Sequence, residues 1–85
     1  MESQARLAFK NLETVLASAG ASLADVVEIM TFHTHFHRDI LEFIKVKDEF
    51  LPENFPAWTA IGVAELARPE YLVEIRAVAV IGSGA

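Results

Sequence analysis

The sequence predicts a single α+β domain in which two helices cover one face of a mixed sheet. Two segments repeat apolar residues with helical spacing, and three others are rich in β-branched and aromatic residues. They follow one another as helix, strand, helix, strand, strand, which packs compactly as helices on a sheet. A chain of 85 residues has room for one domain. A sheet of three strands leaves two edges free to pair with other strands.

The first helix and the first strand are predicted from the pattern of apolar residues. The helix is expected over residues 4–19, and Gly20 follows it as a residue that commonly ends helices. The strand is expected over residues 26–34, which contain no Gly or Pro. One face of the helix collects its apolar residues: Ala5, Ala8, Phe9, Leu12, Val15, Leu16 and Ala19.

The second half of the chain adds one helix and two strands. Helical spacing returns over residues 38–50, and Pro52 stands just past the end. Residues 51–56 contain two prolines and are predicted to form a loop. Strands are predicted over residues 57–63 and 72–81, because both are rich in apolar and β-branched residues.

Composition and charge exclude several classes of protein. The chain has no cysteine, so disulfides and thiolate metal sites are absent. Its net charge of -5, with Lys and Arg scattered singly, argues against nucleic acid as a partner. No apolar stretch reaches membrane-spanning length, so we expect a cytoplasmic protein with no membrane partner. Because 53% of the residues are hydrophobic, some apolar surface needs covering, which favours self-association.

Several runs of residues carry a resemblance to a known family. They are residues 4–12, 19–27, 32–34, 55–63 and 73–79. In this order and spacing they resemble the reactive-intermediate (enamine/imine) deaminase family, also called the Rid, YjgF-like or L-PSP endoribonuclease family. The resemblance covers nearly the whole chain.

The resemblance implies a chorismate-mutase-like fold, a homotrimer, and clefts between subunits where enamine and imine intermediates are hydrolysed. It implies no cofactor and no metal. Family members usually begin with further strands that carry part of the pocket. We therefore expect residues 1–85 to form a single, N-terminally truncated domain that corresponds to the C-terminal two-thirds of the family's usual domain.

The resemblance also places the expected site. Glu74 matches the glutamate that activates water and is the expected catalytic residue. Trp58 matches the arginine that holds the substrate carboxylate, although an indole has one N–H donor and no charge. Trp58, Thr59 and Ala60 are the expected ligand-binding residues. This combination resembles a divergent, YjgH-like branch of the family.

Three functions remain open at this point. The leading hypothesis is a trimer that binds a small carbonyl, enamine or imine metabolite between subunits, because replacement of the arginine by Trp58 argues against conventional 2-imino acid deaminase activity. The second is an active enamine or imine deaminase, a hydrolase with altered substrate preference. The third is a non-catalytic regulatory or structural module. Endoribonuclease activity is the least favoured, because the chain is acidic.

The two main site residues have structural alternatives. Glu74 can pair with Arg76, which lies on the same face of a strand. Trp58 shares a strand face with Ala60 and Gly62, so it either floors a cleft and stacks on a ligand or fills space as packing.

Other polar residues have ordinary structural interpretations. His33 and His35 would share a strand face, as paired metal ligands sometimes do, but the strand is predicted to end near Thr34. We therefore interpret them, with His37, as a polar strand end and helix start. A solvated face with weak ion pairs is expected from Lys45, Lys47, Asp48, Glu49 and Glu53.

Overall fold

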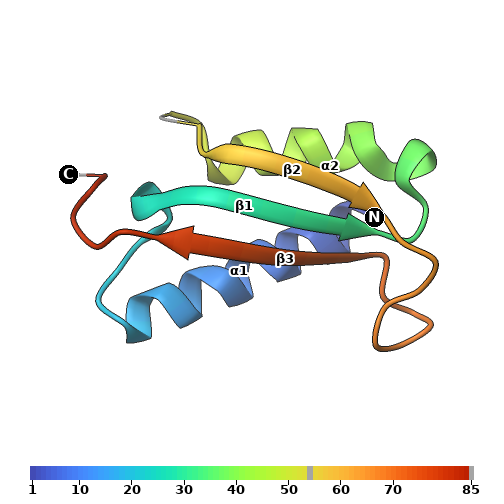
Figure 1. The fold of residues 1–85 in the computed structure, drawn as a ribbon, viewed down its shortest axis with the longest axis horizontal. Coiled ribbons are helices and arrows are strands. Elements are labelled where there is room, and N and C mark those ends of the chain that lie inside the picture. Colours follow the sequence, from blue (N-terminus) through green and yellow to red (C-terminus); the bar gives the residue numbers. More distant parts are fainter. Residues whose placement is uncertain (54, 85) are drawn as a thin grey trace.

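The computed structural model of this protein describes residues 1–53 and 55–84. Its elements are α1 (Glu2–Ser18), the short 3-10 helix η1 (Leu23–Asp25), β1 (Val26–His33), α2 (Phe36–Phe50), β2 (Ala57–Gly62) and β3 (Val73–Ala79). Both helices lie on the same side of the sheet (Figure 1). The predicted α+β architecture is confirmed. Asn54, part of the predicted loop, lies outside the described residues.

The three strands form a mixed sheet in the order β2-β1-β3. β1 is the central strand, parallel to β2 and antiparallel to β3. The edges of the sheet are therefore β2 on one side and β3 on the other (Figure 1). Each edge strand presents unpaired backbone groups along its outer side.

The observed boundaries differ from the predicted ones by a few residues. α1 begins two residues earlier than expected, and α2 begins at Phe36 because the chain turns directly after β1. Gly20 adopts a φ of 81°, the left-handed conformation that ends α1. β3 ends at Ala79 rather than residue 81, because Ala79 already pairs with Val26, the first residue of β1.

The hydrophobic core lies between the sheet and the two helices. Phe9 from α1 stacks on Phe43 and Phe50 from α2, with ring centroids 5.8 and 5.2 Å apart. Ile29 and Val46 are fully buried beside these rings. This aromatic contact holds α1 against α2, since buried rings dominate the apolar area that such a small domain can remove from water.

The opposite face of the sheet is left uncovered by α1 and α2, which both lie on the other side (Figure 1). The register places Phe32 of β1 between Ile61 of β2 and Glu74 of β3 on this face. Met30 lies on it as well, next to Arg76. We call this surface the open face. Separately, neither α1 nor α2 has the length and apolar character needed to cross a membrane, among the residues described.

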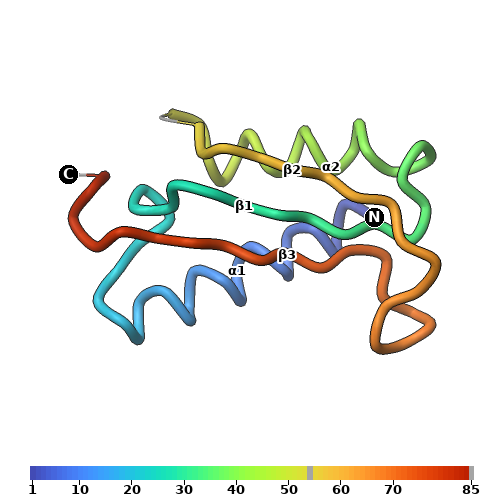
Figure 2. The backbone as a smooth tube through the Cα atoms, in the orientation of Figure 1, coloured from blue at the N-terminus to red at the C-terminus, as the bar shows by residue number. Residues whose placement is uncertain are grey.

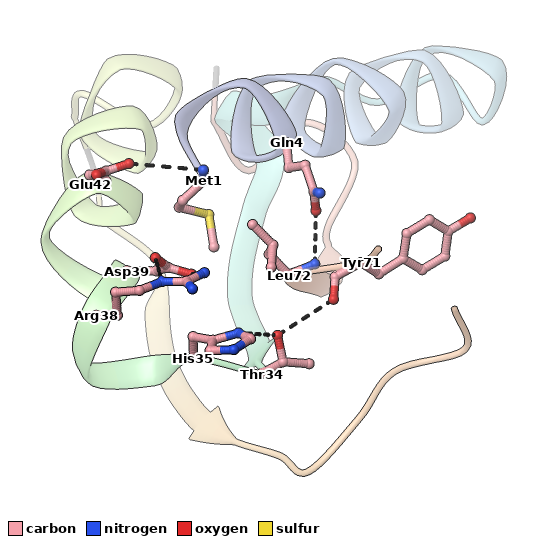
Figure 3. Close-up of polar contacts among 9 residues, drawn as sticks. All are labelled: Met1, Gln4, Thr34, His35, Arg38, Asp39, Glu42, Tyr71 and Leu72. Carbon is pink, nitrogen blue, oxygen red and sulfur yellow. Dashed lines mark hydrogen bonds and ion pairs between the residues drawn. The ribbon is translucent and has the colours of Figure 1, made fainter. Parts of the chain in front are cut away.

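Gln4 joins the start of α1 to the segment that leads into β3. Its side-chain amide donates to the Glu70 carbonyl at 2.7 Å, and its oxygen accepts from the Leu72 N–H at 2.8 Å. The N-terminus and the segment that follows β3 lie at opposite ends of the sheet, and α1 starts near the end where β3 begins (Figure 2). Figure 3 shows the Gln4 contact to Leu72 next to Thr34, which follows β1.

Candidate functional site

A groove runs along α1 and β3 and has a volume of about 640 Å³. We call it the α1–β3 groove. Its apolar lining includes Leu7 and Val15, which are 59% and 64% exposed. Its polar lining residues are Gln4, Asn11, Glu70, Tyr71 and Glu74. An apolar groove with a few polar groups is the usual form of a binding site.

Glu74 lies in β3 at the rim of the α1–β3 groove and is exposed. Its carboxylate stands on the open face, beside Phe32 of β1. Arg76 follows on the same face, but within residues 1–53 and 55–84 Glu74 takes part in no ion pair. Its carboxylate is therefore accessible to water or to a ligand.

Trp58 faces the helices, on the other side of the sheet. Its ring centroid lies 6.0 Å from that of Phe43 in α2, and its indole N–H donates to the Thr31 hydroxyl at 2.9 Å. The predicted face shared with Ala60 and Gly62 agrees with the register, in which these residues pair with Thr31 and His33. These contacts make Trp58 at least in part a packing residue, the structural alternative raised by its sequence context.

Thr59 and Ala60 point in opposite directions. Thr59 is exposed and pairs with Met30 on the open face. Ala60 is half-buried and pairs with Thr31 on the helix side. The three predicted ligand-binding residues of β2 are therefore divided between the two faces, because successive side chains of a strand alternate.

One chain does not bring Trp58 and Glu74 together. Trp58 is in edge strand β2 and faces the helices, whereas Glu74 is in edge strand β3 and faces away from them. The central strand β1 lies between the two. A cleft that contains both residues must therefore take them from two different chains.

Lys47 lies beside Trp58 and was wrongly assigned to a solvated face. Its side chain is only 9% exposed, and its ammonium donates to the Asp48 carboxylate at 2.9 Å. The ammonium stands 4.9 Å from the centroid of the Trp58 ring and 5.3 Å from that of Phe55. Helical spacing does not reveal this position, because the two rings come from β2 and the segment before it.

The other charged residues predicted to form this solvated face are exposed, as expected: Lys45, Asp48, Glu49 and Glu53. Lys45 pairs with Glu2 at 2.8 Å, and Glu49 forms two hydrogen bonds with Arg6. Contact with Arg6 lowers the pKa of Glu49 below its ordinary value, through the hydrogen bonds first. These surface pairs join α1 to α2 and contribute little to stability.

His33 is fully buried instead of forming a polar strand end. Its Nε2 lies 2.8 Å from the Thr31 hydroxyl, and its ring packs edge-on against Phe36 and Phe43. Its Nδ1 has no hydrogen-bond partner in the described part of the chain. Burial lowers the pKa of His33, while the nearby carboxylate of Asp39 opposes that effect.

Asp39 and the two remaining histidines lie at the start of α2. The guanidinium of Arg38 donates twice to the nearly buried Asp39 carboxylate, and these bonds hold the pKa of Asp39 below its usual value (Figure 3). His35 and His37 are exposed, unlike His33. Across the described residues no group of three or more His, Cys, Asp or Glu side chains is arranged to hold a metal ion.

Comparisons with known proteins agree with this fold. The family model described as Endoribonuclease L-PSP matches residues 1–81. The RutC family protein YjgH of Escherichia coli (strain K12) is 38% identical over 75 residues, which are 87% of this chain and 57% of that protein. A 2-iminobutanoate/2-iminopropanoate deaminase of Dermatophagoides farinae is 36% identical over 81 residues, 95% of this chain and 62% of that protein.

Solved structures show the same fold. The structure of E. coli TdcF with bound serine superimposes with a TM-score of 0.86 at 29% identity, and covers 93% of this chain and 63% of that one. The chain thus spans about three-fifths of the length of the relatives it matches. The match of the family model to almost every residue, together with the shared fold, shows that this chain belongs to the Endoribonuclease L-PSP family, the YjgF-like family that its sequence resembles.

Proposed function

We propose that this protein is a trimer that binds a small metabolite of the carbonyl, enamine or imine type in clefts between subunits. The observation that carries the proposal is the position of Trp58 and Glu74 at opposite edges and on opposite faces of one sheet. Contact between the β2 side of one chain and the β3 side of the next puts both residues in one cleft. Such a head-to-tail contact between identical subunits closes into a ring of three when neighbours are related by a rotation of one third of a turn.

The open face supports self-association. Met30, Phe32 and Ile61 place apolar side chains on the sheet surface that faces away from α1 and α2. Contiguous apolar surface of this kind commonly marks an interface between proteins. Packing of three copies through their open faces would remove it from water.

The relatives support a small ligand with an imine or amino group. One relative is named as a deaminase of 2-iminobutanoate and 2-iminopropanoate, and another binds serine. In this chain the exposed carboxylate of Glu74 is suited to orient or deprotonate a water molecule, which is what imine hydrolysis needs. An enamine or imine deaminase with altered substrate preference is therefore the second candidate function, and it uses the same cleft.

The experiment measures oligomer mass, ligand binding and substrate hydrolysis on the same samples. We expect native mass spectrometry to give three chains, calorimetry to show binding of 2-oxobutyrate, and the Glu74→Gln variant to change that binding or to lose hydrolysis of 2-iminobutyrate while staying trimeric. The matched control is Glu28→Gln, since Glu28 is an exposed glutamate on the same face of the sheet. Hydrolysis of 2-iminobutyrate, assayed in parallel, assigns the protein to the binder or to the enzyme class.

Three results would contradict the proposal, in whole or in part. A monomer that still binds 2-oxobutyrate excludes a cleft between subunits. Trimers that bind neither 2-oxobutyrate nor the imine favour the third function, a non-catalytic structural module. Unchanged binding of 2-oxobutyrate together with unchanged hydrolysis of 2-iminobutyrate in Glu74→Gln removes Glu74 from the site.

A further inference from the structure

Lys47 occupies an unusual position for a lysine. Lysine side chains are rarely buried, yet this one is 9% exposed, with its ammonium paired to Asp48 and close to two aromatic rings. An ammonium within about 6 Å of an aromatic centroid is attracted by the negative face of the ring. The rings of Trp58 and Phe55 therefore hold the charge of Lys47 at the β2 side of the sheet.

The ammonium keeps hydrogen-bonding capacity for a ligand. It has three N–H donors and uses one of them on Asp48, counting only the described residues. Asp48 itself is 52% exposed, so water competes for its carboxylate. Phe55 is 65% exposed although it is a large apolar side chain, so one of the two rings beside Lys47 lies at the surface.

The other lysine of this helix shows the contrast. Lys45 is 65% exposed and its ammonium is paired with Glu2 across the helix contact. It contacts no aromatic ring in the described chain. Lys47 is thus the cation of α2 that lies next to Trp58, and Trp58 itself brings no charge to the cleft.

We propose that Lys47 binds the carboxylate of the metabolite in the cleft beside Trp58. This inference rests on the proposed function and narrows its ligand to small carbonyl or imine compounds that carry a carboxylate. The Trp58 and Phe55 rings fix the ammonium in place, and the carboxylate accepts its remaining N–H donors. The Asp48 carboxylate repels the carboxylate of the ligand, and this repulsion lowers the affinity.

The test uses Trp58 as its own reporter, because it is the single tryptophan of the chain. We expect 2-oxobutyrate to change the tryptophan fluorescence saturably and 2-butanone, which lacks the carboxylate, to do so much more weakly. The Lys47→Met variant, which keeps the apolar stem, is expected to bind 2-oxobutyrate about tenfold more weakly or worse. The Lys45→Met variant is the matched control, with unchanged affinity.

Asp48→Asn provides a second measurement on a half-exposed position. Removal of the like charge is expected to tighten 2-oxobutyrate binding, with no gain for 2-butanone. If the unmodified chain and Lys47→Met bind 2-oxobutyrate with equal affinity, and thermal unfolding by circular dichroism is unchanged, the role of Lys47 is overturned. The proposed cleft between subunits is not contradicted by that result. Weaker binding by Asp48→Asn also overturns the role of Lys47. Absence of 2-oxobutyrate binding in the unmodified chain overturns both this inference and the proposed function.

Discussion

The regions around the two edge strands, β2 and β3, differ in how much of their surface is buried within the chain. On the β2 side, the Thr31 hydroxyl joins the Trp58 indole to the His33 imidazole beneath α2. On the β3 side, the α1–β3 groove leaves Leu7 and Val15 exposed. Near β2 the helix-facing surface of the sheet is therefore interior, where the Thr31 hydroxyl contacts polar atoms of the same chain, whereas the α1–β3 groove is surface.

The largest expected effect on stability comes from Phe43→Ala, and its contrast with Leu7→Ala tests this difference between the two regions. Phe43→Ala empties a fully buried site that touches Phe9, His33 and Trp58, so we expect a loss of about 3–5 kcal/mol in the free energy of unfolding. Leu7→Ala, on the other side, is expected to change it by less than about 0.5 kcal/mol. Urea unfolding at one protein concentration measures both. Equal losses would show that the α1–β3 groove is as tightly packed as the core.

A smaller loss of unfolding free energy is expected when the buried Thr31 hydroxyl is removed. Thr31→Val keeps the shape of the side chain but leaves the Trp58 N–H and the His33 Nε2 without their partner, at a cost of about 1–3 kcal/mol. Thr59→Val makes the same change at an exposed position of β2 and is expected to be nearly neutral. Urea unfolding again measures the difference, and a neutral Thr31→Val would show that water replaces the hydroxyl.

Near β3, a smaller loss of unfolding free energy is expected when the two partly exposed hydrogen bonds of Gln4 are removed. Gln4→Ala removes the contacts to Glu70 and Leu72, and we expect a loss of roughly 1 kcal/mol. Amide hydrogen exchange should increase at Leu72 first, because its N–H loses its acceptor. Asn11→Ala, at another polar position of the same groove, should leave this exchange unchanged. Unaltered exchange at Leu72 in Gln4→Ala would argue against the bridge.

The smallest expected effect is a dependence on pH through His33. Its pKa in the folded state is lowered by burial, so the unfolded chain binds the proton more readily. The contribution of neutral His33 is complete above its ordinary pKa and is lost as the pH falls through that value. Stability should therefore decline from about pH 7 to about pH 5, partly offset by Asp39. His33→Gln should flatten this decline and His37→Gln should not; equal slopes would exclude His33.

The sequence predicted part of the candidate site and missed the rest for a physical reason. Glu74 and Trp58 were predicted as site residues through the family resemblance, and strand alternation correctly grouped Trp58 with Ala60 and Gly62. Lys47 was missed, because nothing local distinguishes it from Lys45 on an amphipathic helix. Its burial depends on rings that come from other elements of the fold.

By itself the sequence determined the order and type of the elements, since helical and strand periodicity arise from contacts between residues close along the chain. It also determined the end of α1 at Gly20, which is a local backbone property. Only the tertiary structure decided that β1 is the central strand, that Trp58 and Glu74 face opposite ways at opposite edges, and that Lys47 is buried. These features depend on contacts between distant segments, and the choice among such contacts is made by packing of the whole core rather than by local preference.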